Sequence, residues 1–512
     1  MKKTVFKNVF LYDGDLNARL CRRVIVEDGY IRYIGNDEIG ADESCEIYEG
    51  GYLSKPFCDH HFHLPGSALY DLYGINLCMC GSAMEYKKVL TAKSKDKKVT
   101  CGNIVRGFGW NIDCLSRYFA ESEQTPLEFL DDIFPDIPAV MFSLDFHSCW
   151  CNTLAVKMLK SDGIVSVYRD REVPHGAECI FHEEVANKIF ALPRYGFSEE
   201  EIRTAFLILQ RQLIGYGITE VFTLFFIGAT FGSMLNVLRG LDRTGALKIK
   251  IWYSCTVLPS YTEYEIKKTI ENSLTYSGGN LNLISVKAYA DGVIDNHSAY
   301  LSEPYSDVDS RGMSLWTERK FIDTVKCASS YGLPMHIHAI GDAAAEFSVK
   351  CLAAAGAPAN GRHIVTHLQL CKEETMSLMA KRDIVACMQP FWFLRGKQAC
   401  ITDAERLGKR ADGQYPVRSM ADRGVKILFS SDCPATVCFD PILGINMASE
   451  EDGSGENVTR KQAYMAYYAG SFRDDPIILG KGDPATFIRT DKNLLEFQDA
   501  KITDTFINGI KE

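Results

Sequence analysis

The chain has 512 residues, of which 46% are hydrophobic and 24% are charged, and its formal net charge is −10 at pH 7. A chain of this length can bury a large core, either as one big domain with a satellite or as two to three ordinary domains. The acidic balance argues against nucleic acid or an anionic membrane as the main partner. These bulk properties admit an enzyme with a small-molecule substrate, and a homodimer is compatible with them.

The start of the chain and its cysteines bear on location. Met1–Lys7 lacks the apolar core of a signal peptide, and no run of roughly 18 apolar residues predicts a transmembrane helix. The 18 cysteines are scattered without framework spacing, so we expect reduced thiols and a cytoplasmic protein. The pairs Cys78/Cys80 and Cys149/Cys151 lack the further paired cysteines that a four-ligand metal site needs.

Short strands and tight turns are predicted at both ends of the chain. Val24–Ile34 contains two apolar-rich segments around an Asp-Gly turn, a strong hairpin signal. Near the C-terminus, Ala485–Ile488 and Thr505–Ile510 also have strand patterns. We therefore predict one small β-sandwich domain assembled from residues 1–55 and 480–512.

The middle of the chain alternates between strand and helix patterns. Ser198–Glu201 is a capping box that opens a helix reaching Gly215, and the strand-like Ile218–Thr223 follows. Further strand candidates are 251–254, 284–289, 334–338, 363–367, 384–388 and 427–432. Repeated β-α units predict an α/β fold, a (β/α)₈ TIM-like barrel over residues 56–479, with an irregular insertion at about 66–135.

Polar residues gather at the predicted strand ends. The strand in Pro56–Leu64 ends in His61 and His63, whose i, i+2 spacing points both imidazoles to one side of the strand. Neutral imidazole is a favoured zinc ligand. In a barrel, the carboxyl ends of the strands converge on the face where active sites are built. The other polar residues at such ends are Lys287, His338, His367 and Asp432.

Each of these residues also has an ordinary structural interpretation. His336 and His363 are expected to be structural histidines of their strands. Lys287 could be a rim lysine paired with Asp291, and Asp432 could cap the following helix. The joint placement at strand ends favours the functional interpretation.

Several segments, in chain order, resemble the metal-dependent amidohydrolase superfamily, and within it the family 3 branch that includes N-substituted formamide deformylases. These segments are Asp59–His63, Gly107–Trp110, Asp145–Ser148, Val286–Gly292, Glu303–Ser306, His338–Asp342, Thr366–Gln369, Ser431–Pro434 and Gly480–Ala485. Thr366 stands where the family commonly has glutamate, and His297 where it commonly has arginine. The likeness covers nearly the whole chain, and the departures affect substrate choice more than chemistry.

The resemblance implies a metal-dependent hydrolase that cleaves a C–N bond of amide type in a small molecule by attack of a metal-activated hydroxide. His61, His63 and Asp432 would hold one divalent ion, and His338 and His367 a second. A carbamate formed on Lys287 from carbon dioxide would bridge the two ions. Zinc is expected, although manganese and iron suit similar ligands. Asp432 would be the catalytic residue that moves the proton from water to the leaving amine.

The substrate pocket is predicted from residues near these segments. His147, Trp110, Phe391 and Trp392 are the candidates, and for the aromatic residues core packing is an equal alternative. Two other functions stay open. A mononuclear deaminase on the same scaffold would use one metal and leave Lys287 uncarboxylated. A non-catalytic scaffold protein would be expected to have lost ligands, and none is missing here.

Overall fold

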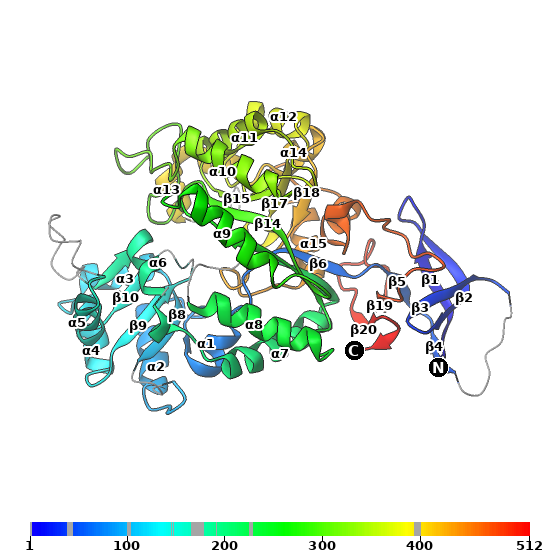
Figure 1. Ribbon diagram of the computed structural model, residues 1–512, viewed down its shortest axis with the longest axis horizontal. Coiled ribbons are helices and arrows are strands. Elements are labelled where there is room, and N and C mark those ends of the chain that lie inside the picture. Colours follow the sequence, from blue (N-terminus) through cyan, green and yellow to red (C-terminus); the bar gives the residue numbers. More distant parts are fainter. Residues whose placement is uncertain are drawn as a thin grey trace.

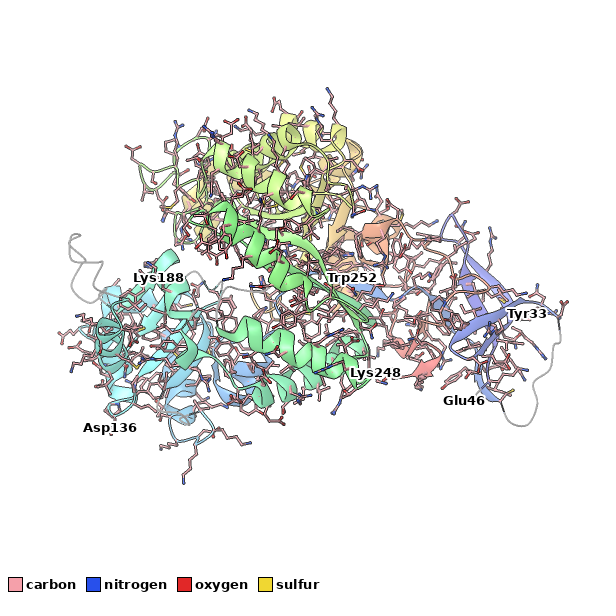
Figure 2. All side chains as sticks on the ribbon, viewed as in Figure 1. Tyr33, Glu46, Asp136, Lys188, Lys248 and Trp252 are labelled. Atoms are coloured by element: carbon pink, nitrogen blue, oxygen red, sulfur yellow. The ribbon has the colours of Figure 1, made fainter. Side chains whose placement is uncertain are left out.

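The part of the chain that the structure describes forms three β-sheets (Figure 1). The computed structural model describes residues 3–37, 45–99, 104–144, 146, 148–164, 179–190, 192–224, 229–393 and 401–512. Figure 2 shows Asp136, in the loop before the strand Ala139–Ser143, and Tyr33, in the strand Tyr30–Gly35, near opposite ends of the long axis, with the barrel between them. Within the described residues, none of the helices has the length and apolar run that crossing a bilayer requires.

The central sheet is a parallel barrel whose strands follow one another in chain order. Its strands are β6 (Phe57–Phe62), β12 (Ile218–Leu224), β13 (Lys250–Thr256), β14 (Leu281–Tyr289), β15 (Met335–Ala339), β16 (Ile364–His367), β17 (Val385–Met388) and β18 (Ile427–Phe429). Helices that separate or follow these strands are α7 (Glu199–Gly215), α8 (Ala229–Arg243), α9 (Glu263–Leu274), α10 (Glu318–Ser330), α11 (Asp342–Ala355), α12 (Glu373–Lys381), α13 (Ile401–Leu407), α14 (Val417–Asp422), α15 (Pro441–Ser449) and α16 (Arg460–Tyr467). The predicted α/β barrel is confirmed.

Local sequence signals agree with these elements. Every residue of β12 is buried, as expected for a strand covered on both faces by other elements. The Ser198 hydroxyl accepts a hydrogen bond from the Glu201 amide, and the Glu201 carboxylate accepts one from the Ser198 amide, so the predicted capping box opens α7. The helix that leads into β12 therefore has a well-defined N-terminal end.

The barrel closes between its first and last strands. The Asp432 amide donates to the His61 carbonyl over 2.9 Å, and the His63 amide donates to the Cys433 carbonyl over 2.8 Å. The Asp59 carboxylate also spans this seam, because it accepts from the backbone amide of Ser431 at 3.1 Å. The closure thus brings the ends of β6 and β18, with their polar side chains, to the same place.

The two ends of the chain form one β domain, as predicted. Its strands are β1 (Lys3–Tyr12), β2 (Ala18–Glu27), β3 (Tyr30–Gly35), β4 (Glu46–Glu49), β5 (Tyr52–Ser54), β19 (Phe487–Thr490), β20 (Ile502–Ile507) and β21 (Ile510–Lys511). They make one continuous sheet in the order β21-β20-β19-β5-β1-β2-β3, with β4 on β1. The predicted hairpin turn lies at Asp28 and Gly29, which both have positive φ (54° and 80°), as a type I′ turn requires.

The insertion after β6 is regular rather than irregular. Its elements are α1 (Ala68–Tyr73), β7 (Ile75–Asn76), α2 (Ala83–Lys93), β8 (Val105–Trp110), α3 (Ile112–Glu121), α4 (Pro126–Ile133), β9 (Ala139–Ser143), β10 (Ser148–Cys151), α5 (Thr153–Ser161), β11 (Ile180–His182) and α6 (Glu183–Phe190). The sheet has the order β11-β10-β9-β8-β7 and reaches well beyond residue 135. Its strands are short, with two to six residues each, so their sequence periodicity is too brief to predict.

Candidate functional site

His61, His63 and Asp432 meet at the closing seam of the barrel. The Nε2 atoms of His61 and His63 lie 3.1 and 3.2 Å from the same oxygen, Oδ1 of Asp432. Asp432 has φ 59°, a left-handed conformation that non-glycine residues rarely adopt and that is often found at functional sites. The hydrogen bond from the Asp432 amide to the His61 carbonyl holds this conformation, so the carboxylate points at the two imidazoles.

His367 and His338 approach the same point from β16 and β15. The His367 ring is 5.1 Å from the His61 ring and 4.6 Å from the His338 ring, between centroids. One ligand atom from each of His61, His367 and Asp432 lies within 4.8 Å of the others. The His367 Nδ1 atom is 3.0 Å from the Gln389 side-chain oxygen, which sets the direction of the ring.

Lys287, on β14, lies deeper in the barrel than these groups. Its side chain is fully buried, and its Nζ atom has no hydrogen-bond partner among the described residues. Asp291, the partner considered in the structural interpretation, instead accepts hydrogen bonds from the backbone amides of Tyr300, Ile340 and Gly341. Burial lowers the pKa of the Lys287 amine to about 7, because the charged form loses its hydration.

The charge states of the cluster match those of a cation-binding donor set. Burial lowers the pKa of His367 to about 4 and holds the pKa of His61 well below its usual value, so both imidazoles are neutral near pH 7. Burial opposes ionisation of Asp432, but its histidine neighbours hold the pKa of this carboxyl well below its usual value. The Asp432 Oδ1 atom is buried and makes no hydrogen bond among the described residues. Neutral imidazoles around an unsatisfied carboxylate oxygen are the donors that Zn²⁺ uses in proteins.

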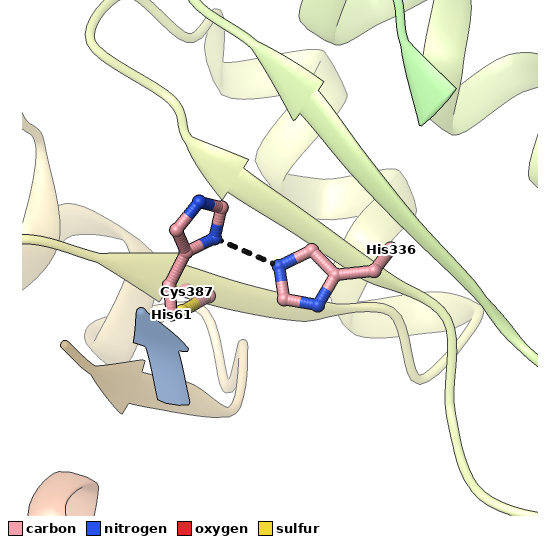
Figure 3. A group of neighbouring side chains, drawn as sticks. All are labelled: His61, His336 and Cys387. Atoms are coloured by element: carbon pink, nitrogen blue, oxygen red, sulfur yellow. Dashed lines mark hydrogen bonds between the residues drawn. The ribbon is translucent and has the colours of Figure 1, made fainter. Parts of the chain in front are cut away.

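His336, two residues before His338 on β15, lies deeper in the barrel and contacts His61 (Figure 3). The Nε2 atom of His336 is 3.1 Å from Nδ1 of His61, and the Thr366 hydroxyl is 3.2 Å from the same nitrogen. Cys387 of β17 has its sulfur near both histidines. His336 was expected to be a structural histidine, and the structure places it, buried, against the far side of a predicted metal ligand.

Sequence reasoning placed Asp59 in a matching segment without giving it a role, and it missed Gln389. Asp59 opens the Asp-x-His-x-His segment, accepts from the His61 amide at 3.2 Å, and has its pKa raised to about 7 by burial. Gln389 follows β17 directly, bonds His367, and donates to the Ser430 hydroxyl over 2.9 Å. The strand-end rule that found the histidines could have found Gln389 as well.

Two adjoining cavities open above the cluster. The smaller, of about 40 Å³, is lined by all six predicted metal ligands and by Phe146, Tyr289, Val293, Trp392, Pro434 and Ala435. The larger, of about 330 Å³, shares Val293, Trp392 and Ala435 with it and is also lined by Trp110 and Phe391. Trp110 itself is fully buried, and its indole donates to the Met141 carbonyl over 2.7 Å. His147, the remaining pocket candidate, lies outside the described residues.

Comparison with known proteins identifies the family. The sequence model described as "Amidohydrolase family" matches residues 49–508. The chain belongs to the amidohydrolase family. One curated relative is YtcJ of Bacillus subtilis (strain 168), which is 23% identical over 487 residues, or 91% of this chain and 88% of that protein. Another is LONG AFTER FAR-RED 3 of Arabidopsis thaliana, which is 24% identical over 458 residues, or 83% of this chain and 74% of that protein.

The same fold occurs among solved structures. This amidohydrolase-family chain matches the crystal structure of an uncharacterized metal-dependent hydrolase from Pyrococcus horikoshii OT3 with a TM-score of 0.73 and 22% identity. The match covers 97% of this chain and 99% of that one. The barrel and the β domain are therefore shared over nearly the full length.

Proposed function

We propose that this chain is a metal-dependent hydrolase that cleaves a C–N bond of amide type in a small molecule. The observation that carries the proposal is the convergence of two imidazole nitrogens, from His61 and His63, on one unsatisfied oxygen of Asp432. Membership of the amidohydrolase family supports it, as does the position of the cluster at the carboxyl ends of the barrel strands.

The residues divide into two sets of ligands. His61, His63 and Asp432 would hold one divalent ion, and His338 and His367 a second, with zinc as the metal that suits them best. Lys287 would supply the bridging anion as a carbamate, since no side chain or backbone group in the described part of the chain forms a competing hydrogen bond with its buried amine. Bound there, the ions would lower the pKa of water and polarise the substrate carbonyl.

The protein groups position the substrate and move the proton. The aromatic side chains of Phe391 and Trp392 line the larger cavity and give the substrate an apolar surface. The Asp432 carboxylate accepts the proton of the attacking water and delivers it to the nitrogen as the C–N bond breaks. The products are a carboxylic acid and an amine.

A deamination that uses one metal is the second candidate. The ligand atoms of His61, His367 and Asp432 lie within 4.8 Å of one another, close enough to surround a single ion without Lys287. In that reaction the product is ammonia, and the lysine stays an amine. The number of bound ions and the identity of the released nitrogen compound separate the two candidates.

The test measures metal content and product together. Purified protein is analysed for metals and screened against N-formyl, N-acyl and cyclic amides and amino-substituted aromatic rings, with mass spectrometry of the products. Two ions per chain and a carboxylic acid product are expected, and alanine at both His61 and His63 should remove about one ion and abolish turnover. His363→Gln is the control, because this buried histidine directly precedes β16, at the end of the strand that points away from His367 and the cluster. Wild-type protein with no stoichiometric metal and no hydrolysis would refute the proposal.

A further inference from the structure

Tyr289 lies in the same layer of the barrel as His338, one of the predicted metal ligands. It follows Lys287 by two residues on β14, so both side chains point to the barrel interior, with Tyr289 nearer the carboxyl end of the strand. The pairing of β14 with β15 confirms the layers, since Lys287 lies opposite His336 and Tyr289 opposite His338. The Tyr289 ring lies 5.3 Å from the His338 ring and 4.7 Å from the Lys287 amine.

The Tyr289 hydroxyl is buried and has no hydrogen-bond partner among the described residues. Buried phenol groups nearly always bond to protein or to water, so an unsatisfied one calls for a physical explanation. The side chain lines the same small cavity as Asp432 and His61. The phenol therefore forms part of the wall of this cavity.

Other donors at this cavity already have partners. The Trp392 indole donates to the Thr436 hydroxyl over 2.6 Å, and one nitrogen of His63 lies 2.5 Å from the Leu224 carbonyl. The Lys287 amine, which likewise makes no hydrogen bond with the residues that the structure describes, is assigned to the carbamate by the proposed function. Among the described side chains of this wall, the phenol of Tyr289 is a neutral donor for which the structure shows no partner.

We propose that Tyr289 donates a hydrogen bond to the carbonyl oxygen of the scissile amide, and that this bond strengthens when the oxygen becomes an oxyanion. The inference rests on the proposed hydrolytic function and adds the group that receives the developing charge. Water adds to the carbonyl carbon, a C–O bond forms, and the π electron pair moves onto the carbonyl oxygen. Tyr289 keeps its proton throughout. The pair returns as the C–N bond breaks, and the proton taken by Asp432 goes to the departing nitrogen.

This role predicts a particular kinetic pattern. A donor aimed at the oxyanion stabilises the transition state more than the bound amide, so its loss lowers kcat while KM changes little. A donor that only held the substrate would raise KM and leave kcat unchanged. A group that held the metal centre would change metal content.

The experiment uses Tyr289→Phe, which deletes the hydroxyl and keeps the ring. Tyr195→Phe is the matched control, because its hydroxyl is also buried and without a described partner, yet its ring lines neither of the two cavities. On the fastest amide of the screen, kcat of Tyr289→Phe should fall by about 10²–10³-fold with KM within about threefold of wild type. A phosphonamidate analogue of that amide, with tetrahedral phosphorus at the carbonyl carbon, should lose affinity by a comparable factor.

Each outcome decides one point. Metal content equal to wild type together with the fall in kcat and in analogue affinity supports the inference. A kcat within about threefold of wild type overturns it, as do a raised KM at unchanged kcat and a loss of metal. A wild-type protein that neither binds metal nor hydrolyses any amide overturns the proposed function instead, so the two failures are distinguishable.

Discussion

Replacing His336 with leucine should weaken metal binding without unfolding the protein. In the proposed centre, His61 faces the metal with Nε2, so its proton lies on Nδ1 and needs an acceptor. Two acceptors stand near this nitrogen, Nε2 of His336 at 3.1 Å and the hydroxyl of Thr366 at 3.2 Å. Leucine fills a similar volume at this fully buried position and accepts no hydrogen bond.

The size of the effect follows from the number of acceptors removed. Outer partners of metal-bound histidines typically contribute 10–100-fold to metal affinity. His336→Leu removes one of two acceptors, so we expect a loss of about tenfold, or about 1.4 kcal/mol. Combining it with Thr366→Val removes both acceptors and should bring the loss to about 100-fold. His336→Gln keeps an acceptor and should stay close to wild type.

The assay is a competition for zinc between each variant and a chromophoric chelator, which gives the dissociation constant without depending on turnover. Circular dichroism and the thermal midpoint of the metal-free protein verify that each variant is folded. Affinities of His336→Leu and of the double variant within about threefold of wild type would refute the assignment of His336 as the residue that positions His61.

Asp432→Asn keeps the size of the side chain but cannot act as a base, so turnover should fall by about 10²–10⁴-fold, and activity within about threefold of wild type would contradict the proposed proton transfer. Arg473 forms a bidentate pair with Glu220, whose side chain is only 8% exposed. Arg473→Met leaves this carboxylate without its arginine and should lower the free energy of unfolding by about 3 kcal/mol. Adding Glu220→Gln to the same chain should restore most of the thermal midpoint. For Asp504, burial alone would raise the pKa, but hydrogen bonds from Arg489 and its other neighbours lower it. The ionised Asp504 therefore stabilises the fold fully above about pH 4, and this contribution is lost as the pH falls further. The difference in thermal midpoint between wild type and Asp504→Asn should shrink from about pH 7 to about pH 3.5. A constant difference would contradict this reasoning.

Strand-end chemistry explains how much of the site could be predicted from sequence. A barrel gathers the carboxyl ends of its strands, so the end positions of His61, Lys287 and Asp432 were enough to expect them around one cavity, where the structure places them. Their roles as metal ligands stay predictions. His336 and Tyr289 were missed because their environment depends on the register between strands that are far apart in the chain.

The insertion shows a different limit of sequence reasoning. Strand β7 has two residues and β11 has three, which is less than the span over which alternation can be recognised. Their identity as strands comes from pairing with neighbours rather than from their own sequence. The β domain was easier, since the Asp28–Gly29 turn is a local signal that needs no distant partner.

The seam between β6 and β18 determines when the site can exist during synthesis of the chain. Asp59 and Ser431, which the seam joins, are 372 residues apart in sequence. The ribosome releases β6 with His61 and His63 first, and Asp432 emerges only after every other strand of the barrel has been made. The pairing of strand β5 with β19 forms later still, because β19 starts at Phe487. A chain that ends before Asp432 therefore carries the imidazoles without the carboxylate that they face.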